Sequence, residues 1–154
     1  MLDALDSTAV DILARQGRIS WADLGEKLGL SPPAAAERVR RLEAQGVILG
    51  FAAVVAPPTV GYPLLAFIGV TLDHVKHRPA FLRLVEKLPQ ILECHHVAGE
   101  EDFVLKVRCR DIQDLETLIT EQIKGLTGVA RTRTSIALST VKETFRLPPV
   151  SFPP

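Results

Sequence analysis

The 154-residue chain is poor in several diagnostic kinds of residue. It has only two cysteines, Cys94 and Cys109, which are too few for a disulfide framework. No run of about 18 uninterrupted apolar residues occurs, so no membrane span is expected. The N-terminal segment lacks the basic and apolar regions that a secretory signal needs. These absences favour a cytoplasmic protein with reduced thiols.

The sequence also lacks an excess of positive charge. It has 18 basic and 18 acidic residues, and residues 1–50 contain six basic and seven acidic ones. Because the phosphate backbone supplies most of the nonspecific affinity of a DNA-binding protein, this balance argues mildly against a nucleic-acid partner. Any DNA binding must depend on where individual charges are placed. A hydrophobic content of 47% nevertheless indicates a globular chain of one domain or two small ones.

Signatures of catalysis and of metal binding are absent as well. The sequence has no nucleophile elbow, no phosphate-binding loop and no pair of catalytic carboxylates. His95 and His96 are adjacent, so on a strand they point to opposite faces, and no cluster has the spacing of a zinc site. We therefore expect no enzyme activity, no metal and no cofactor.

Residues 1–50 show the pattern of three short helices. Asp3, Ser20 and Ser31 each stand where a helix N-cap is expected. The break at residues 28–31 is too short for two antiparallel helices, so the second and third helices should cross steeply and the third should project outward. This is the helix-turn-helix pattern. The apolar residues that recur at helical spacing are Leu5, Ala9, Ile12, Leu13, Trp21, Leu24, Leu28, Ala35, Val39 and Leu42.

The rest of the chain predicts a linker and an α+β domain. Residues 47–55 are apolar and rich in β-forming residues, which predicts a strand leaving the first domain. Residues 51–63 are assigned to strand and linker, because three prolines and a glycine disfavour regular structure near their end. Residues 64–154 form the second domain. Its predicted strands are 64–72, 91–98, 103–109 and 129–141, and its predicted helices are 77–88 and 111–125. The order βαββαβ is that of a ferredoxin-like antiparallel sheet.

Both helices of such a domain cover one face of the sheet. Alternate residues of the first strand point to opposite faces. Those expected to face the helices are Ala66, Ile68, Val70 and Leu72. The other face then carries an exposed apolar patch of Leu65, Phe67 and Val104. We expect a second copy of the chain to cover this patch, which predicts a homodimer formed by sheet-to-sheet packing.

Several motifs stand in a characteristic order along the chain. In the first half they are Gly17-Arg18-Ile19-Ser20, Leu28-Gly29-Leu30-Ser31-Pro32 and Glu37-Arg38-Val39-Arg40-Arg41-Leu42-Glu43, and in the second Val97-Ala98-Gly99-Glu100-Glu101-Asp102-Phe103. With this order the sequence resembles the Lrp/AsnC family over nearly its whole length. The resemblance implies a winged helix-turn-helix, a ligand-sensing domain, dimers that associate into octamers, and an amino-acid effector bound between subunits.

The third helix supplies the candidate DNA contacts. Arg38 and Arg41 are expected on its exposed arc, where they can contact phosphate or guanine, and Arg40 is expected on a flank. The alternative is a solvated face paired with neighbouring glutamates. The front of the helix offers few hydrogen-bonding groups, which predicts sparse base readout and specificity that depends on DNA shape. The predicted DNA site comprises Ser20, Ser31, Pro33, Ala34, Arg38, Arg40 and Arg41.

A turn at residues 99–102 is the candidate effector site. Its residue types are ordinary in turns, but the resemblance implies that it lines the effector pocket. An acidic side chain would hold the ammonium of an amino acid and backbone N–H groups its carboxylate. The predicted residues are Gly99, Glu100, Glu101 and Asp102, with Thr132 and Thr134 as candidates that plain β-propensity also explains. The predicted function is a sequence-specific transcriptional regulator under effector control. The alternative is an architectural DNA-organising protein of the same fold without an effector.

Overall fold

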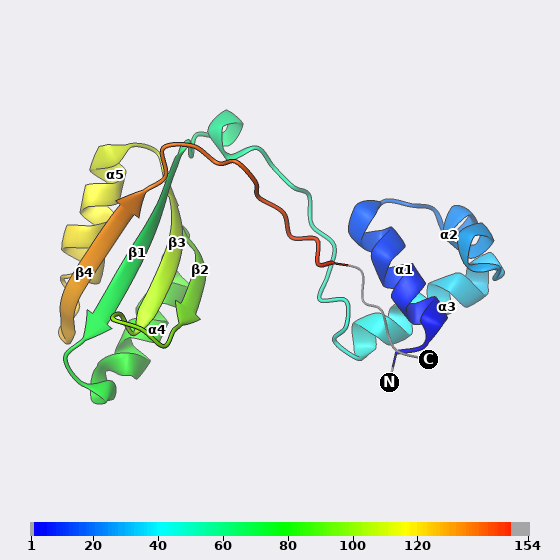
Figure 1. Cartoon of the computed structure of the whole chain (residues 1–154), viewed down its shortest axis with the longest axis horizontal. Helices are drawn as coiled ribbons and strands as arrows, with labels where there is room; N and C mark the ends of the chain where they lie inside the picture. The colour runs from blue at the N-terminus through cyan, green and yellow to red at the C-terminus, as the bar shows by residue number, and fades with distance from the viewer. Residues whose placement is uncertain (1, 149–154) are drawn as a thin grey trace. The chain divides into compact units, whose positions relative to one another are not determined.

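The computed structural model describes residues 2–148 and divides into two compact units (Figure 1). One unit contains the chain up to Val54 together with the segment from Lys142 onward, and the other spans Val55–Val141. The boundary at Val54 falls within residues 51–63, the stretch expected to be strand and linker. None of the described helices is long and apolar enough to cross a membrane.

Three helices build the first unit, called here the helical unit: α1 (Ala4–Arg15), α2 (Trp21–Leu28) and α3 (Pro32–Ala44). The three predicted N-caps are confirmed, because each side chain accepts a hydrogen bond from the backbone N–H three residues later. Gly29 ends α2 in the left-handed conformation, with φ of 66°. The capping pairs are Asp3 Oδ1 with Asp6 N at 2.7 Å, Ser20 Oγ with Asp23 N at 3.1 Å and Ser31 Oγ with Ala34 N at 3.4 Å.

The core of the helical unit is small and aliphatic. It follows the predicted helical stripes, except that Leu5 and Trp21 are exposed rather than buried. Both lie in the first turns of their helices. The buried cluster consists of Ala9, Leu13, Leu24, Leu28, Ala35, Val39 and Leu42.

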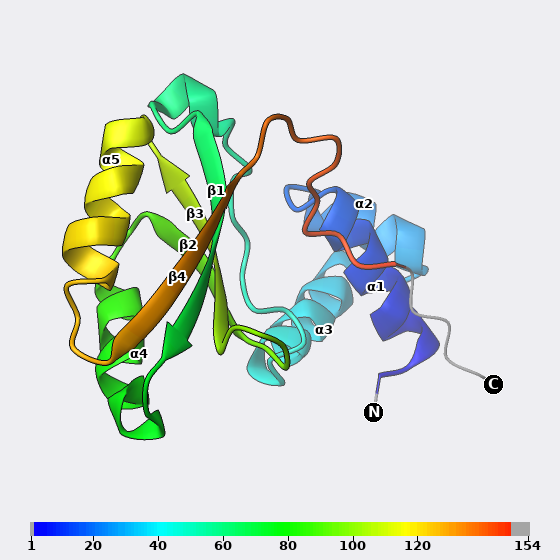
Figure 2. The ribbon, with the colours of Figure 1, turned by 60° about the vertical axis from the view of Figure 1, so that its left-hand side comes forward.

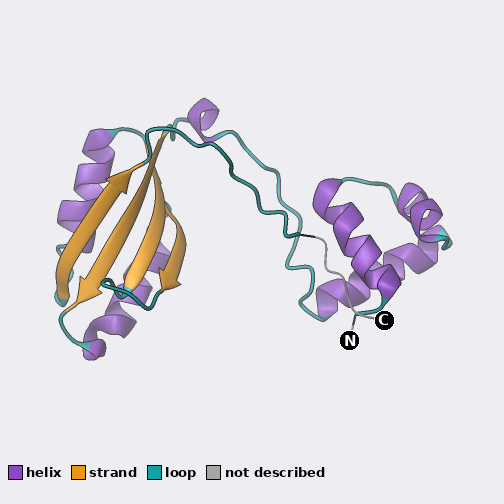
Figure 3. Cartoon of the chain, viewed as in Figure 1, coloured by secondary structure: helices purple, strands orange, loops and turns teal. Residues whose placement is uncertain are grey.

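The predicted strand at residues 47–55 is wrong, because the described chain has no strand between α3 and residue 64 (Figure 3). The described part of the helical unit therefore contains helices and no strand. β-Forming side chains favour an extended backbone, but a strand also needs a hydrogen-bonded neighbour. Val54 is almost fully exposed, as expected of an extended segment without one. Pro57–Val60 form a short 3-10 turn before the second unit's sheet.

A four-stranded antiparallel sheet forms the second unit, called here the sheet unit. Its strands are β1 (Leu64–Leu72), β2 (Ile91–His96), β3 (Phe103–Cys109) and β4 (Val129–Ile136), in the order β2-β3-β1-β4. The helices α4 (Arg78–Lys87) and α5 (Ile112–Thr117) both lie against one face of the sheet (Figure 2). The predicted ferredoxin-like βαββαβ order is confirmed.

The elements of the sheet unit differ from the prediction in four places. A 3-10 turn, Val75–His77, precedes α4, and α5 continues as a π-helix over Leu118–Ile123. The strands predicted at 91–98 and 129–141 end earlier, at His96 and Ile136. β4 ends near the N-terminal end of its neighbour β1, so the ladder has no partner to continue with.

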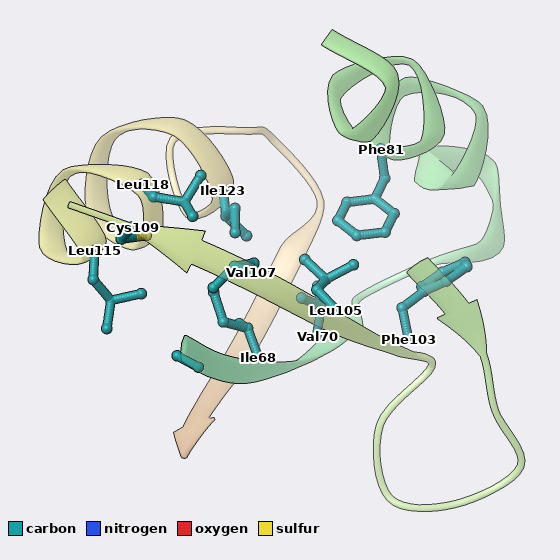
Figure 4. Packing of buried hydrophobic residues seen from close by; sticks show 11 residues of the cluster. Ile68, Val70, Phe81, Phe103, Leu105, Val107, Cys109, Leu115, Leu118 and Ile123 are labelled. Carbon is teal, nitrogen blue, oxygen red and sulfur yellow. The ribbon is translucent and has the colours of Figure 1, made fainter. Parts of the chain in front are cut away.

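The core of the sheet unit lies between the sheet and its two helices (Figure 4). Phe81 of α4 packs against Phe103 of β3 with ring centroids 4.8 Å apart. Ala66, Ile68 and Val70 face this core, as predicted. The prediction that Leu65 is exposed is wrong, since the residue is only 7% exposed. It lies close to the sheet end, where its carbonyl accepts a hydrogen bond from Ala137 and the chain that follows β4 passes it.

Candidate functional site

The turn between α2 and α3 is tight because Gly25 has no side chain. The Gly25 carbonyl accepts a hydrogen bond from Leu30 N at 2.8 Å, which folds the turn back onto α2. A Cβ at Gly25 would lie 2.7 Å from the Leu30 carbonyl oxygen and 3.3 Å from Pro32 N. Glycine inside a helix normally weakens it, so its presence here is explained by this close approach. The turn sets the start of α3 and with it the direction in which α3 projects.

The exposed stripe of α3 is centred on Pro33, Glu37 and Arg40. Helical geometry places Arg40 within about 20° of Pro33 around the axis and Arg38 about 140° away. The expectation that Arg38 lies on the exposed arc and Arg40 on a flank is therefore wrong. Ala34 is exposed as expected, beside this stripe.

The three arginines of α3 differ in how free they are. The Arg40 side chain is 70% exposed and pairs only with Glu37, at 3.1 Å, among the described residues. The Arg41 side chain is 48% exposed. The Arg38 side chain is only 16% exposed, because its Nη1 donates to the carboxylates of Asp3 and Asp6. Arg40 and Arg41 are thus presented to solvent, whereas Arg38 is held within the helical unit.

Asp6 is the centre of this ionic cluster, and its side chain is 4% exposed. Burial opposes its ionisation, but the backbone N–H of Asp3 and the guanidinium groups of Arg38 and Arg41 outweigh it and lower its pKa below the usual value. The hydrogen bonds from Arg38 and from the Asp6 backbone also lower the pKa of Asp3. Both carboxylates are consequently charged at neutral pH. Their local excess of negative charge is neutralised by two arginines of α3.

Ser20 and Ser31 are exposed at the starts of α2 and α3, where their hydroxyls already serve as N-caps. Ser20 Oγ also donates to Asp23 Oδ2 at 2.6 Å. A capping hydroxyl at a helix start leaves the neighbouring backbone N–H groups turned outward, where they suit a phosphate.

The predicted effector turn joins β2 to β3. Asp102 does not present a free carboxylate, because its Oδ2 accepts a hydrogen bond from Leu72 N at 2.7 Å. The Asp102 backbone N–H in turn donates to Val70 O at 2.9 Å. Asp102 therefore fastens the turn to the end of β1.

Glu101 lies across the face of β1 at Gly69. A Cβ at Gly69 would be 2.6 Å from Glu101 Cγ, so the missing side chain makes the space that Glu101 occupies. Arg133 of β4 stands opposite Gly69 in the ladder and pairs with Glu101 at 3.4 Å and with Glu100 at 3.2 Å. We call Glu100, Glu101 and Arg133 the ionic group of the sheet. Arg133 was not predicted from the sequence.

The structure does not bring Thr132 and Thr134 to this ionic group. They stand opposite Val70 and Ile68 in the ladder, and residues directly opposite share a face. Val70 and Ile68 belong to the core on the helix side. The two threonines therefore point to the helix side of β4, whereas Arg133 points to the other face. Plain β-propensity explains them within this chain.

The face of the sheet away from the helices, called here the open face, is partly apolar. Phe67 is 41% exposed there, and Val104 is half-buried. His95 stands opposite Val104, whereas His96 stands opposite Phe103 and contacts its ring on the core side. The two histidines thus lie on opposite faces, as the sequence predicts.

Together these features define a two-unit DNA-binding regulator: a helix-turn-helix with an exposed third helix, and a ferredoxin-like sheet with a polar turn. Family models agree over most of the chain. Residues 2–43 match the AsnC-type helix-turn-helix domain and residues 65–147 match the Lrp/AsnC ligand binding domain. The chain belongs to the Lrp/AsnC family of transcriptional regulators.

Relatives of known name cover nearly all of the chain. The leucine-responsive regulatory protein of Haemophilus influenzae is 40% identical over 147 residues, which are 93% of this chain and 87% of that protein. The protein of the same name from Escherichia coli K12 is 39% identical over 150 residues, 95% of this chain and 90% of the relative. Both relatives are regulatory proteins.

Solved structures agree with the fold. A transcriptional regulator from Neisseria meningitidis, in complex with L-methionine, has a TM-score of 0.91 and 30% identity, covering 96% of this chain and 97% of its own. A feast or famine regulatory protein from M. tuberculosis, also complexed with L-methionine, has a TM-score of 0.86 and 37% identity, covering 96% and 99%. AsnC of E. coli has a TM-score of 0.87 and 28% identity, covering 95% and 98%.

Proposed function

We propose that α3 of this regulator enters the major groove of duplex DNA, and that a free amino acid at the Gly99–Asp102 turn controls DNA binding or assembly. The observation that carries the effector assignment is the ionic group of the sheet. It offers one guanidinium and two carboxylates, which complement the carboxylate and the ammonium of an amino acid. The L-methionine bound by two structural relatives supports the same class of ligand.

The ionic group is suited to exchange partners. The side chains of Arg133 and Glu100 are largely exposed, and exposed ion pairs contribute only about 0–1 kcal/mol. An amino acid that replaces these contacts with its own loses little. Glu101 is more buried, so its carboxylate is the fixed point of the group.

Calorimetry with a panel of amino acids that includes L-methionine tests this assignment. We expect one or more to release heat with the wild type and none with Arg133→Ala. Arg131→Ala is the matched control, because Arg131 is exposed two residues away on the same face of β4. If no amino acid binds to a protein that still binds DNA, the architectural alternative holds instead.

Two glycine variants locate the ligand more finely. Gly99 has open space around its Cβ position, so Gly99→Ala leaves the free protein unchanged and weakens effector binding only if the ligand approaches the turn. Gly69→Ala displaces Glu101 and should weaken effector binding through that carboxylate. Unchanged effector affinity in both variants would place the ligand elsewhere.

For the DNA interface, we propose contacts from Arg40 and Arg41, with Pro33 and Ala34 facing the bases and Ser20 and Ser31 near the phosphates. Arg40→Ala should lower the slope of log affinity against log salt by about 0.9, the share of one phosphate contact. Arg15→Ala is the control, because Arg15 lies on α1 and pairs with Asp11. An unchanged slope in Arg40→Ala would remove Arg40 from the interface.

We also propose that the open face joins two copies of the chain and that dimers associate further, up to an octamer. Phe67 is the exposed aromatic residue of this face. Phe67→Asp places a charge at this position and should split the dimer, so that light scattering gives the mass of a monomer. Val75→Asp is the control, because Val75 is exposed outside the sheet. A monomeric wild type, or a Phe67→Asp variant that stays dimeric, would contradict this mode of assembly.

A further inference from the structure

The ionic cluster of the helical unit joins the start of α1 to the middle of α3. Asp6 Oδ1 accepts from Arg38 Nη1 and from Arg41 Nη2, the latter at 2.9 Å. Asp6 Oδ2 accepts from the Asp3 backbone N–H at 3.1 Å. Both oxygens of one buried carboxylate are therefore occupied, one by α3 and the other by the capping box of α1. Such a carboxylate cannot turn without losing contacts to both helices.

The two arginines that meet Asp6 are held differently. Arg38 Nη1 lies 2.7 Å from each carboxylate oxygen of Asp3 and also contacts Asp6, so this end of the side chain is saturated. Arg41 makes a single described contact through Nη2, and its side chain is 48% exposed, whereas that of Arg38 is 16% exposed. Arg41 can thus keep its bond to Asp6 and still present donors to solvent.

The ionic cluster also joins α1 to α3, which pack against each other less than α2 and α3 do. α3 packs mainly on α2, and α1 approaches α3 at fewer points. The described ion pairs that join one helix of the helical unit to another run from Asp3 or Asp6 to Arg38 or Arg41. They fix the rotation of α3 about its axis relative to α1, and so the direction of its arginines.

We propose that Asp6 is a positioning residue for DNA binding: it anchors α3 through Arg38 and orients Arg41 toward a backbone phosphate. Arg38 then supports the interface from inside and touches no DNA. This inference rests on the proposed role of α3 and gives its two arginines, Arg38 and Arg41, different roles. In the opposite model, Asp6 competes with DNA for Arg41, and removing the Asp6 carboxylate tightens DNA binding.

Asp6→Asn tests the proposal, because it removes the charge at nearly constant size. Asp11→Asn is the matched control: it makes the same charge change on the same helix, at a residue that pairs only with Arg15 among the described residues. The probe is a duplex selected by the wild-type protein from a random pool. The titrations use the full-length chain at several salt concentrations, at temperatures where circular dichroism shows every variant folded.

We expect Asp6→Asn to weaken DNA binding about tenfold, because the released Arg41 side chain no longer makes its phosphate contact. The salt slope of this variant should fall by about 0.9 for the same reason. Asp11→Asn should bind as the wild type does or slightly more tightly. Arg41→Ala should lower the salt slope by the same amount as Asp6→Asn, and the double variant should lose less than the sum of the two single losses.

Tighter binding by Asp6→Asn, or additive losses in the double variant, would overturn the proposal. A purely structural role would lower the melting temperature but leave the salt slope of the folded variant unchanged, which also overturns it. If Asp6→Asn does not fold, Asp6→Glu replaces it, with the charge kept and the carboxylate moved by one methylene. Wild-type affinity and slope in that variant would overturn the proposal. A wild type that selects no duplex would instead refute DNA binding itself.

Discussion

The two units of this regulator hold their elements together by different means. The sheet unit has a continuous core with an aromatic pair, Phe81 and Phe103, between the sheet and two helices. The helical unit has a small core without aromatic residues and adds an ionic cluster and a turn that requires glycine. Apolar burial is non-directional, whereas charge-assisted hydrogen bonds and tight turns specify orientation. In the helical unit these directional contacts join α1 to α3, the helix that is proposed to contact DNA.

The largest effect is expected from a substitution that creates a cavity in the core of the sheet unit. Phe81 is fully buried, and Phe81→Ala should destabilise that unit by about 3–5 kcal/mol. The single tryptophan, Trp21, lies in the helical unit, so its fluorescence reports that unit separately. We expect far-UV circular dichroism to show an earlier melt while the Trp21 transition stays in place. An equal shift of both signals would show that the units unfold as one.

Acid should act on the directional contacts of the helical unit. The pKa of Asp6 and that of Asp3 are lowered on folding, so their contribution is fully present above the ordinary value of 3.8 and is lost as pH falls through the lower folded values. Trp21 fluorescence should therefore show a falling melting temperature below about pH 4. The same acid response in Asp6→Asn would contradict this assignment.

Gly25→Ala tests the turn. Alanine normally stabilises a helix by about 1 kcal/mol over glycine, but overpacking costs about 1–3 kcal/mol. Because the new Cβ meets a backbone oxygen at 2.7 Å, we expect a net loss of up to about 2 kcal/mol in the Trp21-reported melt. A more stable Gly25→Ala variant would show that the turn has room. Ala22→Gly, on the exposed side of α2, is the control with the reverse exchange. It should lower the stability only by the difference in helix propensity between alanine and glycine.

The smallest effect is expected at an ion pair that joins no two elements. Arg15 and Asp11 pair at 3.0 Å within α1, with side chains that are 50% and 35% exposed. Asp11→Asn should change the free energy of unfolding by about 0.5 kcal/mol or less, measured by urea denaturation. A loss as large as that of Asp6→Asn would remove the distinction between the cluster and ordinary surface pairs.

Local patterns in the sequence predicted most of the fold. Apolar periodicity and caps are local, so the three helices and the strands at 64–72 and 103–109 have the predicted bounds or nearly so. The prediction of a strand at 47–55 was wrong because strand formation depends on a hydrogen-bonded neighbour. The prediction that Leu65 is exposed was wrong because the alternation of side chains along a strand carries no information about the chain that packs beyond its end.

The candidate sites were predicted less completely, because they depend on contacts between distant residues. Nothing local shows that Arg38 pairs with Asp3, 35 residues away. Two glycines are a signal in the sequence that was not used: Gly25 inside a helix and Gly69 inside a strand each mark a close approach of other atoms. Arg133 stands opposite Gly69 in the ladder, so the position of Gly69 also points to Arg133 once the strand pairing is known.

We have proposed that the sheet unit senses an amino acid and that the helical unit reads DNA under its control. A fluorescence-anisotropy titration of a selected duplex, with and without each amino acid, tests this for the wild type and Arg133→Ala. We expect at least one amino acid to shift the dissociation constant of the wild type, whereas Arg133→Ala binds the duplex without responding. An effector shift that survives in Arg133→Ala, or a wild type that no amino acid affects, would contradict it.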